Sequence, residues 1–254
     1  MREPKYYVVK RHLLGLIETL EAGTALPTER DLAKLLKTSR TTVRQALTEL
    51  VSEGRLERRQ GSGTYVTEPK LAWPLQMSSF TEQAAASGLI VETSLIGAEG
   101  IPASAQIAEA LAVEEGALVH RIERLRIVGG SPMALERSHL AAAKFPGLAE
   151  TMRKEASLYQ VLQRCWDVSV VEAIETIETG PAPPREAELL ATDTGVPMLI
   201  LTRHSFDAQG NPIEWVHSWY RGDRYTFIAR LGMQHHPVTT RTRAQSSRVR
   251  LRAT

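Results

Sequence analysis

Residues 27–66 read PTERDLAKLLKTSRTTVRQALTELVSEGRLERRQGSGTYV, and this stretch decides the fold of the N-terminal part of the chain. Thr28 stands three residues before Asp31, a capping-box pattern that predicts a helix running to about residue 36. A turn at 37–39 separates it from a second predicted helix, between about Arg40 and Glu53. The apolar residues of that helix recur at i, i+3, i+4, i+7 and i+8, as Val43, Ala46, Leu47, Leu50 and Val51. Gly54 is typical of the position just beyond a helix.

Two short strand-like segments follow this helix. Residues 55–59 and 64–67 flank the turn residues 60–63 and predict a β-hairpin. Upstream, a first helix is predicted from Tyr6 to Glu21, closed by Gly23, because one face carries the apolar residues Tyr7, Leu13, Leu14, Ile17 and Leu20. Helix, helix, short turn, helix and hairpin is the order of a winged helix-turn-helix, which we assign to residues 1–68.

The polar face of the third predicted helix carries the chemistry of DNA recognition. Thr41, Gln45 and Thr48 lie roughly opposite the apolar face, and Arg44 flanks them. Arginine can bind guanine through two hydrogen bonds, and glutamine or threonine can reach neighbouring base edges or phosphates. The helix N-terminus favours phosphate and places Ser39 near the DNA backbone. Any one of these elements is also what an ordinary solvated helix or hairpin would show, whereas the complete ordered series favours a DNA-binding domain.

The same stretch resembles the signature of the GntR family of transcription regulators. The resemblance covers about 40 residues, from the PTERDLAKLL segment through SRTTVRQAL to GSGTYV. It implies that Arg30, Arg40 and Arg44 contact phosphates and bases and that Gly63 enters the minor groove. The full predicted DNA-binding set is Arg30, Ser39, Arg40, Thr41, Thr42, Arg44, Gln45 and Gly63.

Charge is distributed unevenly along the chain. Residues 1–70 carry a net charge of +4, residues 71–234 carry −7, and residues 235–254 carry +5. A basic N-terminal part on an acidic body predicts that the first part meets a polyanion and the body does not.

Composition narrows the class of protein further. The single cysteine, Cys165, excludes an intramolecular disulfide framework and a multi-cysteine metal site. The histidines show no metal-ligand spacing, so we expect neither a metal nor a cofactor. No apolar run of about 18 residues and no leader pattern is present, so we expect no membrane association and no signal peptide. The prediction is a cytoplasmic, nucleoid-associated protein.

The rest of the chain has a different pattern. Residues 69–77 read as a linker with two prolines, 78–233 as a second domain, and 234–254 as a basic tail that we expect to be disordered. Strands are predicted at 120–128, 133–140, 168–177, 197–206, 212–220 and 225–231, with helices at 157–165 and 184–191. The helix at 184–191 is expected to expose Glu186 and Glu188. Hairpins with interspersed helices predict an α+β fold with an antiparallel sheet.

This second domain resembles the UTRA domain of the HutC subfamily of GntR regulators, which shares its fold with chorismate lyase. The matching stretches are SFTE at 79–82, RIERLR at 121–126, MALERS at 133–138, ASLY at 156–159, ETIE at 175–178 and IEW…YRGDRY at 213–225. They are similar to the regulators of N-acetylglucosamine use. The resemblance implies an amino-sugar phosphate, such as glucosamine-6-phosphate or N-acetylglucosamine-6-phosphate, as the effector.

The residues themselves point to a binding site for a small anion. Arg124 and Arg126 are two apart in a strand and therefore share one face. Two guanidiniums on a partly buried face need an anion, and phosphate accepts their forked donors well. The predicted effector-binding set is Ser79, Phe80, Thr81, Arg124, Arg126, Glu136, Ser157, Tyr159, Glu214 and Tyr220. The alternative is that the arginines pair with Glu123, Glu136 or Glu214 in a purely structural network.

The register of one hairpin bears on this choice. A two-residue Gly129-Gly130 turn would pair Arg126 with Met133 and place Glu136 on the opposite face from Arg124. A three-residue loop over 129–131 would pair Arg124 with Glu136 on one face. A binding site that uses both residues therefore predicts the three-residue loop.

The leading hypothesis is a regulator, most simply a repressor, that binds a palindromic double-stranded DNA operator as a homodimer. A small anionic effector in the second domain would control that binding. One alternative keeps the DNA-binding role with a different carboxylate or phosphate effector. A second is a lyase-like enzyme domain fused to the DNA-binding part, with Glu175, Glu178 or Glu214 as base. The sequence lacks a nucleophile–base pair, a phosphate loop and a metal cluster, so we predict that the protein is not an enzyme.

Overall fold

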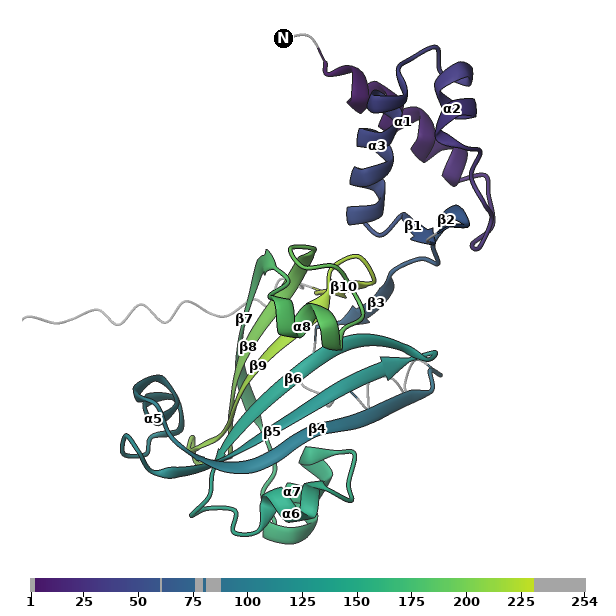
Figure 1. Cartoon of the computed structure of the whole chain (residues 1–254). Helices are drawn as coiled ribbons and strands as arrows, with labels where there is room; N and C mark the ends of the chain where they lie inside the picture. The colour runs from purple at the N-terminus through teal and green to yellow at the C-terminus, as the bar shows by residue number, and fades with distance from the viewer. Residues whose placement is uncertain (1–2, 60, 76–79, 81–87, 231–254) are drawn as a thin grey trace, which may run out of the picture.

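The computed structural model of the 254-residue chain describes residues 3–59, 61–75, 80 and 88–230. The N-terminal part, here called the head, contains α1 (Lys5–Ile17), α2 (Glu29–Leu35) and α3 (Arg40–Ser52). The antiparallel hairpin of β1 (Leu56–Arg59) and β2 (Gly63–Val66) follows them (Figure 1). Val9, Leu13, Leu32, Val43, Leu47, Leu50 and Leu56 are among the residues that form a single core. The head is therefore the predicted winged helix-turn-helix.

Local signals explain where the helices of the head begin. The Thr28 hydroxyl accepts a hydrogen bond from the Asp31 N–H at 3.3 Å, and the Ser39 hydroxyl accepts one from the Thr42 N–H at 3.1 Å. Each bond satisfies one of the amides that a helix N-terminus leaves without a partner. The first helix is shorter than predicted, because it ends at Ile17 and not at Glu21. Tyr7, assigned to its buried face, is 49% exposed, and Val9 is buried in its place.

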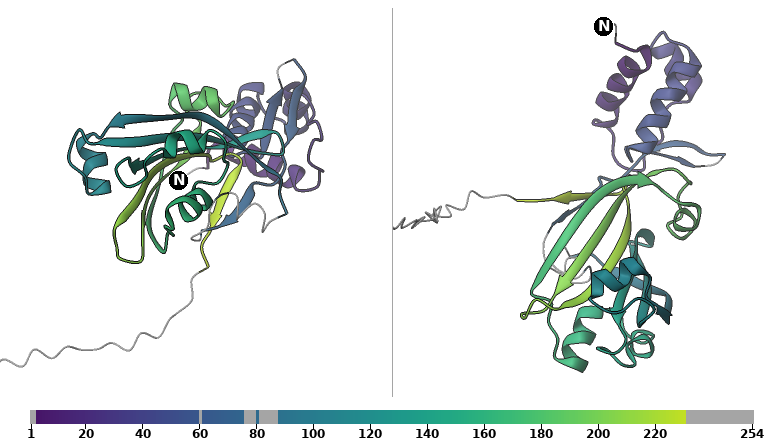
Figure 2. Two further views of the ribbon diagram at one scale, coloured as in Figure 1. Left: turned by 90° about the horizontal axis from the view of Figure 1, so that it is seen from below. Right: turned by 90° about the vertical axis from the view of Figure 1, so that its left-hand side faces the viewer.

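The second domain, here called the effector domain, is built on a six-stranded antiparallel sheet. Its strand order is β4-β5-β6-β9-β8-β7. The strands are β4 (Val91–Pro102), β5 (Leu118–Val128), β6 (Ser131–Ala141), β7 (Glu172–Pro181), β8 (Pro197–Phe206) and β9 (Pro212–Arg221). In the right-hand view of Figure 2 the head lies at one end of this domain. The α+β prediction is confirmed, although β4 was not anticipated.

In the described part of the domain, four short helices cover the two faces of the sheet. On the inner face, α6 (Leu148–Met152) and α7 (Leu158–Trp166) pack on Ile122 and Leu140. On the outer face, α5 (Ala105–Leu111) packs on Trp215, and α8 (Pro184–Leu189) packs on Trp219. No helix in the described part of the chain is long and apolar enough to cross a membrane.

The predicted linker contains a strand. In the middle of 69–77, β3 (Leu71–Pro74) pairs in parallel with β10 (Tyr225–Ile228), the last strand described. Trp73 is completely buried there. The two prolines suggested an irregular segment, but Pro74 closes the strand at its edge, a position that a sheet tolerates. The chain therefore enters the effector domain as part of its structure.

The β5–β6 hairpin has the expected pairing but not the expected loop. Its turn has two residues, because Val128 pairs with Ser131 across Gly129 and Gly130, which both have positive φ. The register shifts between Arg126 and Ile127, where Met133 is the extra residue of a β-bulge. Arg124 therefore pairs with Glu136, as the binding-site hypothesis required. The prediction of a three-residue loop was wrong. The bulge at Met133 produces the same one-residue shift in the pairing of β5 with β6.

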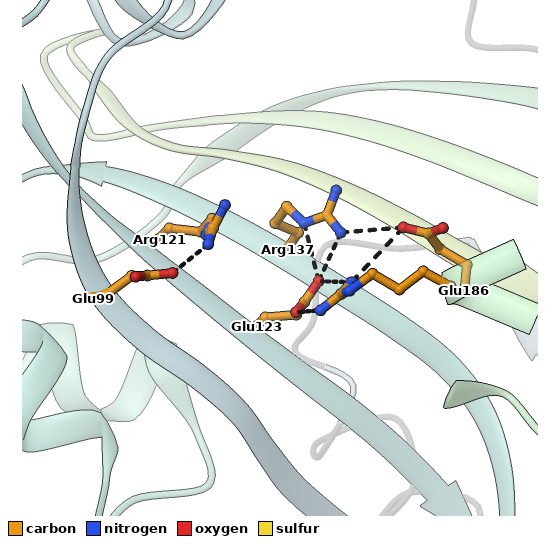
Figure 3. A network of polar contacts seen from close by, with 6 residues as sticks. Glu99, Arg121, Glu123, Arg137 and Glu186 are labelled. Carbon is orange, nitrogen blue, oxygen red and sulfur yellow. Dashed lines mark hydrogen bonds and ion pairs between the residues drawn. The ribbon is translucent and has the colours of Figure 1, made fainter. Parts of the chain in front are cut away.

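The outer face of the sheet carries a network of ion pairs (Figure 3). Arg137 donates to Glu123 at 2.8 Å and to Glu186 at 3.2 Å, and Arg185 also pairs with Glu123. Glu186 is only 7% exposed, which contradicts its predicted exposure. The reason is that α8 lies on the sheet with this carboxylate directed at Arg137. Glu123 belongs to this outer network and cannot neutralise the arginines of the inner face.

Candidate DNA-binding surface and effector pocket

The predicted DNA-binding residues lie on one structural unit, the N-terminal ends of α2 and α3 and the tip of the hairpin. Those exposed to solvent are Arg30, Ser39, Arg40, Thr41, Arg44, Gln45 and Gly63. Thr42 is half-buried, and its hydroxyl lies 2.7 Å from the Ser39 hydroxyl. Thr42 therefore helps to fix the helix N-terminus and is less accessible to DNA than its neighbours.

One acidic residue on this surface was missed by sequence reasoning. Glu29, at the start of α2, accepts hydrogen bonds from the Arg44 guanidinium at 2.8 and 3.1 Å. These bonds lower the pKa of Glu29 below its ordinary value, and the nearby charges of Arg58 and Arg40 add to the effect. This ion pair holds the Arg44 side chain of α3 against the start of α2 in the free protein. The two partners are 15 residues apart, so no local sequence pattern predicts this ion pair.

The hairpin supports the same surface. Arg58 donates to the Thr48 hydroxyl at 3.0 Å and so ties the hairpin to α3. The Arg59 guanidinium lies 4.3 Å from the centre of the Tyr65 ring, an arrangement that holds its charge near the hairpin. Gly63 has a φ of +135°, which a side chain would strain.

The effector domain contains a pocket on the inner face of the sheet, beneath the start of α7. Rows of paired residues across β7, β8, β9, β6 and β5 form its floor, because partners in register share a face. Its polar lining consists of Arg124, Arg126, Glu136, Ser157, Tyr159, Glu175, Arg203, Glu214, Ser218 and Tyr220. Pro74 and Leu75 from the β3 segment and Phe227 from β10 also border it.

Two arginines share one carboxylate in this pocket. Glu136 lies 3.0 Å from an Arg124 nitrogen and 2.7 Å from an Arg126 nitrogen. All three side chains are at least nine-tenths buried. Burial would raise the pKa of Glu136, but the two guanidiniums outweigh it and lower that pKa. Burial and the charge of Arg126 both lower the pKa of Arg124. Arg124, Arg126 and Glu136 therefore form an internal ion-pair network, and these three residues together carry one more positive than negative charge.

Two polar atoms in the lining of the pocket lack hydrogen-bond partners among the described residues. The Arg124 Nε and the Ser157 Oγ are buried and have no hydrogen-bond partner among the residues that the structure describes. Ser157 precedes α7 yet makes no capping bond with its side chain. Unsatisfied buried groups of this kind are unfavourable unless a water or ligand completes them. Both atoms belong to residues that line the pocket.

The opposite side of the pocket is acidic and hydroxyl-rich. Tyr159 donates to Glu214 at 2.9 Å, and Arg203 pairs with Glu175 at 3.0 Å. Burial and the Glu214 charge raise the pKa of Tyr159, which keeps its hydroxyl protonated. Glu175 and Arg203 were not predicted as effector residues. Glu175 lies within a quoted sequence stretch, but only the β7–β8 pairing brings it to Arg203.

Most of the predicted effector residues meet in this pocket. Those that line it are Phe80, Arg124, Arg126, Glu136, Ser157, Tyr159, Glu214 and Tyr220. Phe80 lies beneath Arg126, with 5.3 Å from the guanidinium carbon to the ring centre. Ser79 and Thr81 lie outside the described residues, as does the tail from 231 onward.

A winged helix-turn-helix joined to a second, pocket-bearing domain defines a class of two-domain DNA-binding transcription regulators. The chain belongs to the gntR family of bacterial regulatory proteins, whose model matches residues 5–66, and it carries a UTRA domain, matched at residues 86–226. These matches confirm the predicted family and fold class, including the HutC type of second domain.

Relatives of known name are similar over most of the chain. The HTH-type transcriptional repressor PhnF of Mycolicibacterium smegmatis is 40% identical, over 89% of this chain and 91% of its own length. NagR, a repressor of Bacillus subtilis, is 34% identical over 89% and 93%. The probable fructoselysine utilization operon repressor of Escherichia coli is 29% identical over 87% and 92%. The crystal structure of M. smegmatis PhnF superimposes with a TM-score of 0.64 at 39% identity, covering 89% of this chain and all of that one.

Proposed function

We propose that the protein is a transcription repressor whose DNA binding is controlled by an amino-sugar phosphate bound in the inner-face pocket. The carrying observation is the buried pair Arg124 and Arg126, which share a single carboxylate, while the Arg124 Nε and Ser157 Oγ have no partner among the described residues. Two guanidiniums on one carboxylate leave a positive charge, and a phosphate can accept bonds from both. A phosphate in this position would complete the unsatisfied donors.

The other side of the pocket supports the sugar part of the proposal. Glu175 and Glu214 offer carboxylate oxygens that can accept hydrogen bonds from sugar hydroxyls or from an ammonium group. The fructoselysine in the name of one relative is itself a sugar linked through an amine. A phosphate or carboxylate effector of another kind is the alternative, since the arginine side of the pocket alone would accept it.

The output of the proposed switch is the head. As a homodimer, the protein would place two α3 helices in successive major grooves of a palindromic operator, about one helical turn apart. Effector binding would change the preferred arrangement of the two heads, through a different affinity of the effector for each arrangement. We assign DNA binding to residues 1–68 and effector binding to 78–233, in a cytoplasmic, non-enzymatic regulator, in keeping with the repressor names of its relatives.

Thermal unfolding in the presence of candidate effectors tests the ligand class. Glucosamine-6-phosphate and N-acetylglucosamine-6-phosphate should raise the midpoint, by about 2.7 kcal/mol of stabilisation at a hundredfold excess over Kd. Glucosamine without phosphate should not. A shift with glucose-6-phosphate alone would favour the alternative effector, and no shift with any sugar phosphate would overturn the assignment.

Ser157→Ala is the sharpest variant for the phosphate position. Because the hydroxyl makes no hydrogen bond with the residues that the structure describes, its removal should leave the unfolding midpoint unchanged and weaken effector binding at least tenfold, about 1.4 kcal/mol. Arg126→Ala is less informative, since it leaves the buried Glu136 with one partner fewer. Equal effector affinity in Ser157→Ala and the unaltered protein would remove Ser157 from the site. In the head, Arg40→Ala should abolish binding to an operator obtained by selection from random DNA.

A further inference from the structure

The head and the effector domain meet at the turn between β9 and β10, residues 221–224, here called the docking turn. Arg224 in this turn forms an ion pair with Glu57 of β1, with 2.8 Å between nitrogen and oxygen. Both side chains are about three-quarters buried, so water screens the pair less than an exposed one. Figure 1 shows β1 and β2 beside the end of the domain that carries β10. The ion pair therefore links the DNA-binding hairpin to the effector domain.

A close backbone approach accompanies the ion pair. Gly54 follows α3 with a φ of +70°, and a β-carbon added there would overlap the carbonyl oxygen of Asp223 and lie 2.7 Å from its Cα. Only glycine lets two backbones come this close. The Thr67 hydroxyl donates to the Gly54 carbonyl and holds the segment in place. The residue that follows α3 is thus in direct contact with the docking turn.

Hydrogen bonds within the docking turn and to the neighbouring segment 70–71 hold it in shape. Arg221 forms two hydrogen bonds with the Asp223 carboxylate, at 3.0 and 2.5 Å. Lys70, between the domains, donates to the Gly222 carbonyl at 2.6 Å. The Leu71 N–H donates to the Arg224 carbonyl at 2.8 Å, where β3 begins to pair with β10. A displacement of this turn would therefore move Arg224 and Asp223 together.

The docking turn is also continuous with the effector pocket. Tyr220, which immediately precedes it, lines the pocket, and so does Phe227, three residues after it. The Tyr225 ring packs against Tyr220 and Trp73, with centroids 4.8 and 5.4 Å apart. Pro74, which closes the β3 strand paired with β10, also borders the pocket. Both chain segments that leave the turn therefore contact the space where a ligand would bind.

We propose that the docking turn holds the head in one orientation through the Glu57–Arg224 ion pair and the Gly54–Asp223 contact, and that pocket occupancy releases or shifts the head through this turn. The second half of this inference rests on the proposed effector function, whereas the first half does not. Glu57, Gly54 and Arg224 are positioning residues, since none of them is expected to contact the effector.

Distances between the two domains test the first half without any effector. Spin labels on the exposed Cys165 of α7 and on a cysteine introduced as Lys34→Cys on α2 report the orientation of the head. Labelled chains are diluted with unlabelled protein so that distances within one chain dominate. The ligand-free protein should give one narrow distance distribution, and Arg224→Gln or Glu57→Gln should broaden it.

Matched variants separate this effect from general damage. Gly54→Ala should also broaden the distribution, whereas Gly23→Ala should not, because Gly23 has a similar φ of +82° with nothing within 4 Å of the added β-carbon. Arg121→Gln removes a cross-strand ion pair with Glu99 far from the docking turn and should leave the distribution narrow. An unchanged narrow distribution in Arg224→Gln, Glu57→Gln and Gly54→Ala together would overturn the proposal.

Operator binding with and without glucosamine-6-phosphate tests the second half. Effector coupling in allosteric proteins is about 5–150-fold, and it should fall towards onefold in Arg224→Gln while effector affinity in the pocket is retained. Full coupling in Arg224→Gln would overturn the transmission role. If the unaltered protein binds no sugar phosphate but the distances change as expected, the effector assignment fails and the docking contact stands.

Discussion

At the scale of single residues, Glu29 stands out because it places a negative charge in the proposed DNA-binding surface. It holds Arg44 by hydrogen bonds and lies in the field of Arg40 and Arg58. DNA binding would have to transfer Arg44 from this carboxylate to the nucleic acid. Losing the Glu29–Arg44 bonds therefore costs free energy at any DNA site, and this cost is offset only at sites where Arg44 gains base contacts.

Glu29→Gln should therefore strengthen binding to random DNA more than binding to the operator. The salt dependence should also become steeper, by up to about 0.9 in the slope of log K against log salt for each additional phosphate neutralised. Fluorescence anisotropy over a series of salt concentrations measures both effects. Glu53→Gln is the control, since Glu53 pairs with Lys10 at the far end of α3. Equal slopes in the two variants would contradict the expectation.

His139 provides a second prediction for a single residue. Burial lowers the pKa of His139 to about 4, from an ordinary value of 6.5. Because the folded state binds this proton less tightly than the unfolded state does, the stabilisation is complete above pH 6.5 and is lost as the pH falls towards 4. A shift of this size corresponds to about 3 kcal/mol, as an upper bound.

His139→Gln should flatten the dependence of the unfolding free energy on pH between 7 and 4.5. Urea unfolding at a series of pH values measures it, with His12→Gln as the control on an exposed histidine. If both variants keep the slope of the unaltered protein, other groups cause the acid sensitivity.

The residue scale also shows what sequence reasoning can find in a site. Arg124 and Arg126 could be predicted because strand alternation alone puts them on one face. Glu136 depended on hairpin register, and a bulge at Met133 decided it. Glu175 and Arg203 could not be placed, because their pairing arises from two strands whose partners are 28 residues apart. Local patterns predict a face, whereas long-range pairing selects the partners.

At the scale of elements, the two capped helices of the head allow stability and DNA contact to be separated. Thr28 and Ser39 both cap a helix through their hydroxyls. Replacing either by alanine should lower the unfolding free energy of the head by about 1 kcal/mol. Ser39→Asp keeps a capping oxygen but adds a negative charge at the proposed phosphate contact.

Ser39→Asp should thus retain stability and lose operator affinity, while Thr28→Ala should lose stability and retain most affinity at low temperature. Chemical unfolding and anisotropy on the same samples give both quantities. Retained operator affinity in Ser39→Asp would show that Ser39 caps the helix without contacting DNA.

The helices and strands differ in how reliably they can be predicted from the sequence. The helices of the head were predictable because caps, apolar periodicity and the glycine after α3 agree. The strand β3 was not predicted because prolines stand at 69 and 74, and β4 was not predicted because glycines at 97 and 100 interrupt its alternation. In both cases pairing with a neighbouring strand overrides a weak local preference.

At the scale of the whole molecule, the two domains have separate cores. The core of the head contains no residue of the effector domain, and the four apolar clusters of the effector domain contain none from the head. The contacts described between them include the Glu57–Arg224 ion pair and the backbone approach of Gly54 to Asp223. Domains joined in this way need not unfold together.

The position of the tryptophans makes this testable. Trp73, Trp166, Trp215 and Trp219 all lie beyond the head, so tryptophan fluorescence reports the effector domain alone. Far-ultraviolet circular dichroism also detects α1, α2 and α3. The two signals should give non-coincident urea transitions, with the small head unfolding first. A bound sugar phosphate should move the fluorescence transition to higher urea and leave the early dichroism transition nearly in place. Coincident transitions in the free protein would show that the docking turn couples the domains into one cooperative unit, and Arg224→Gln should then separate them.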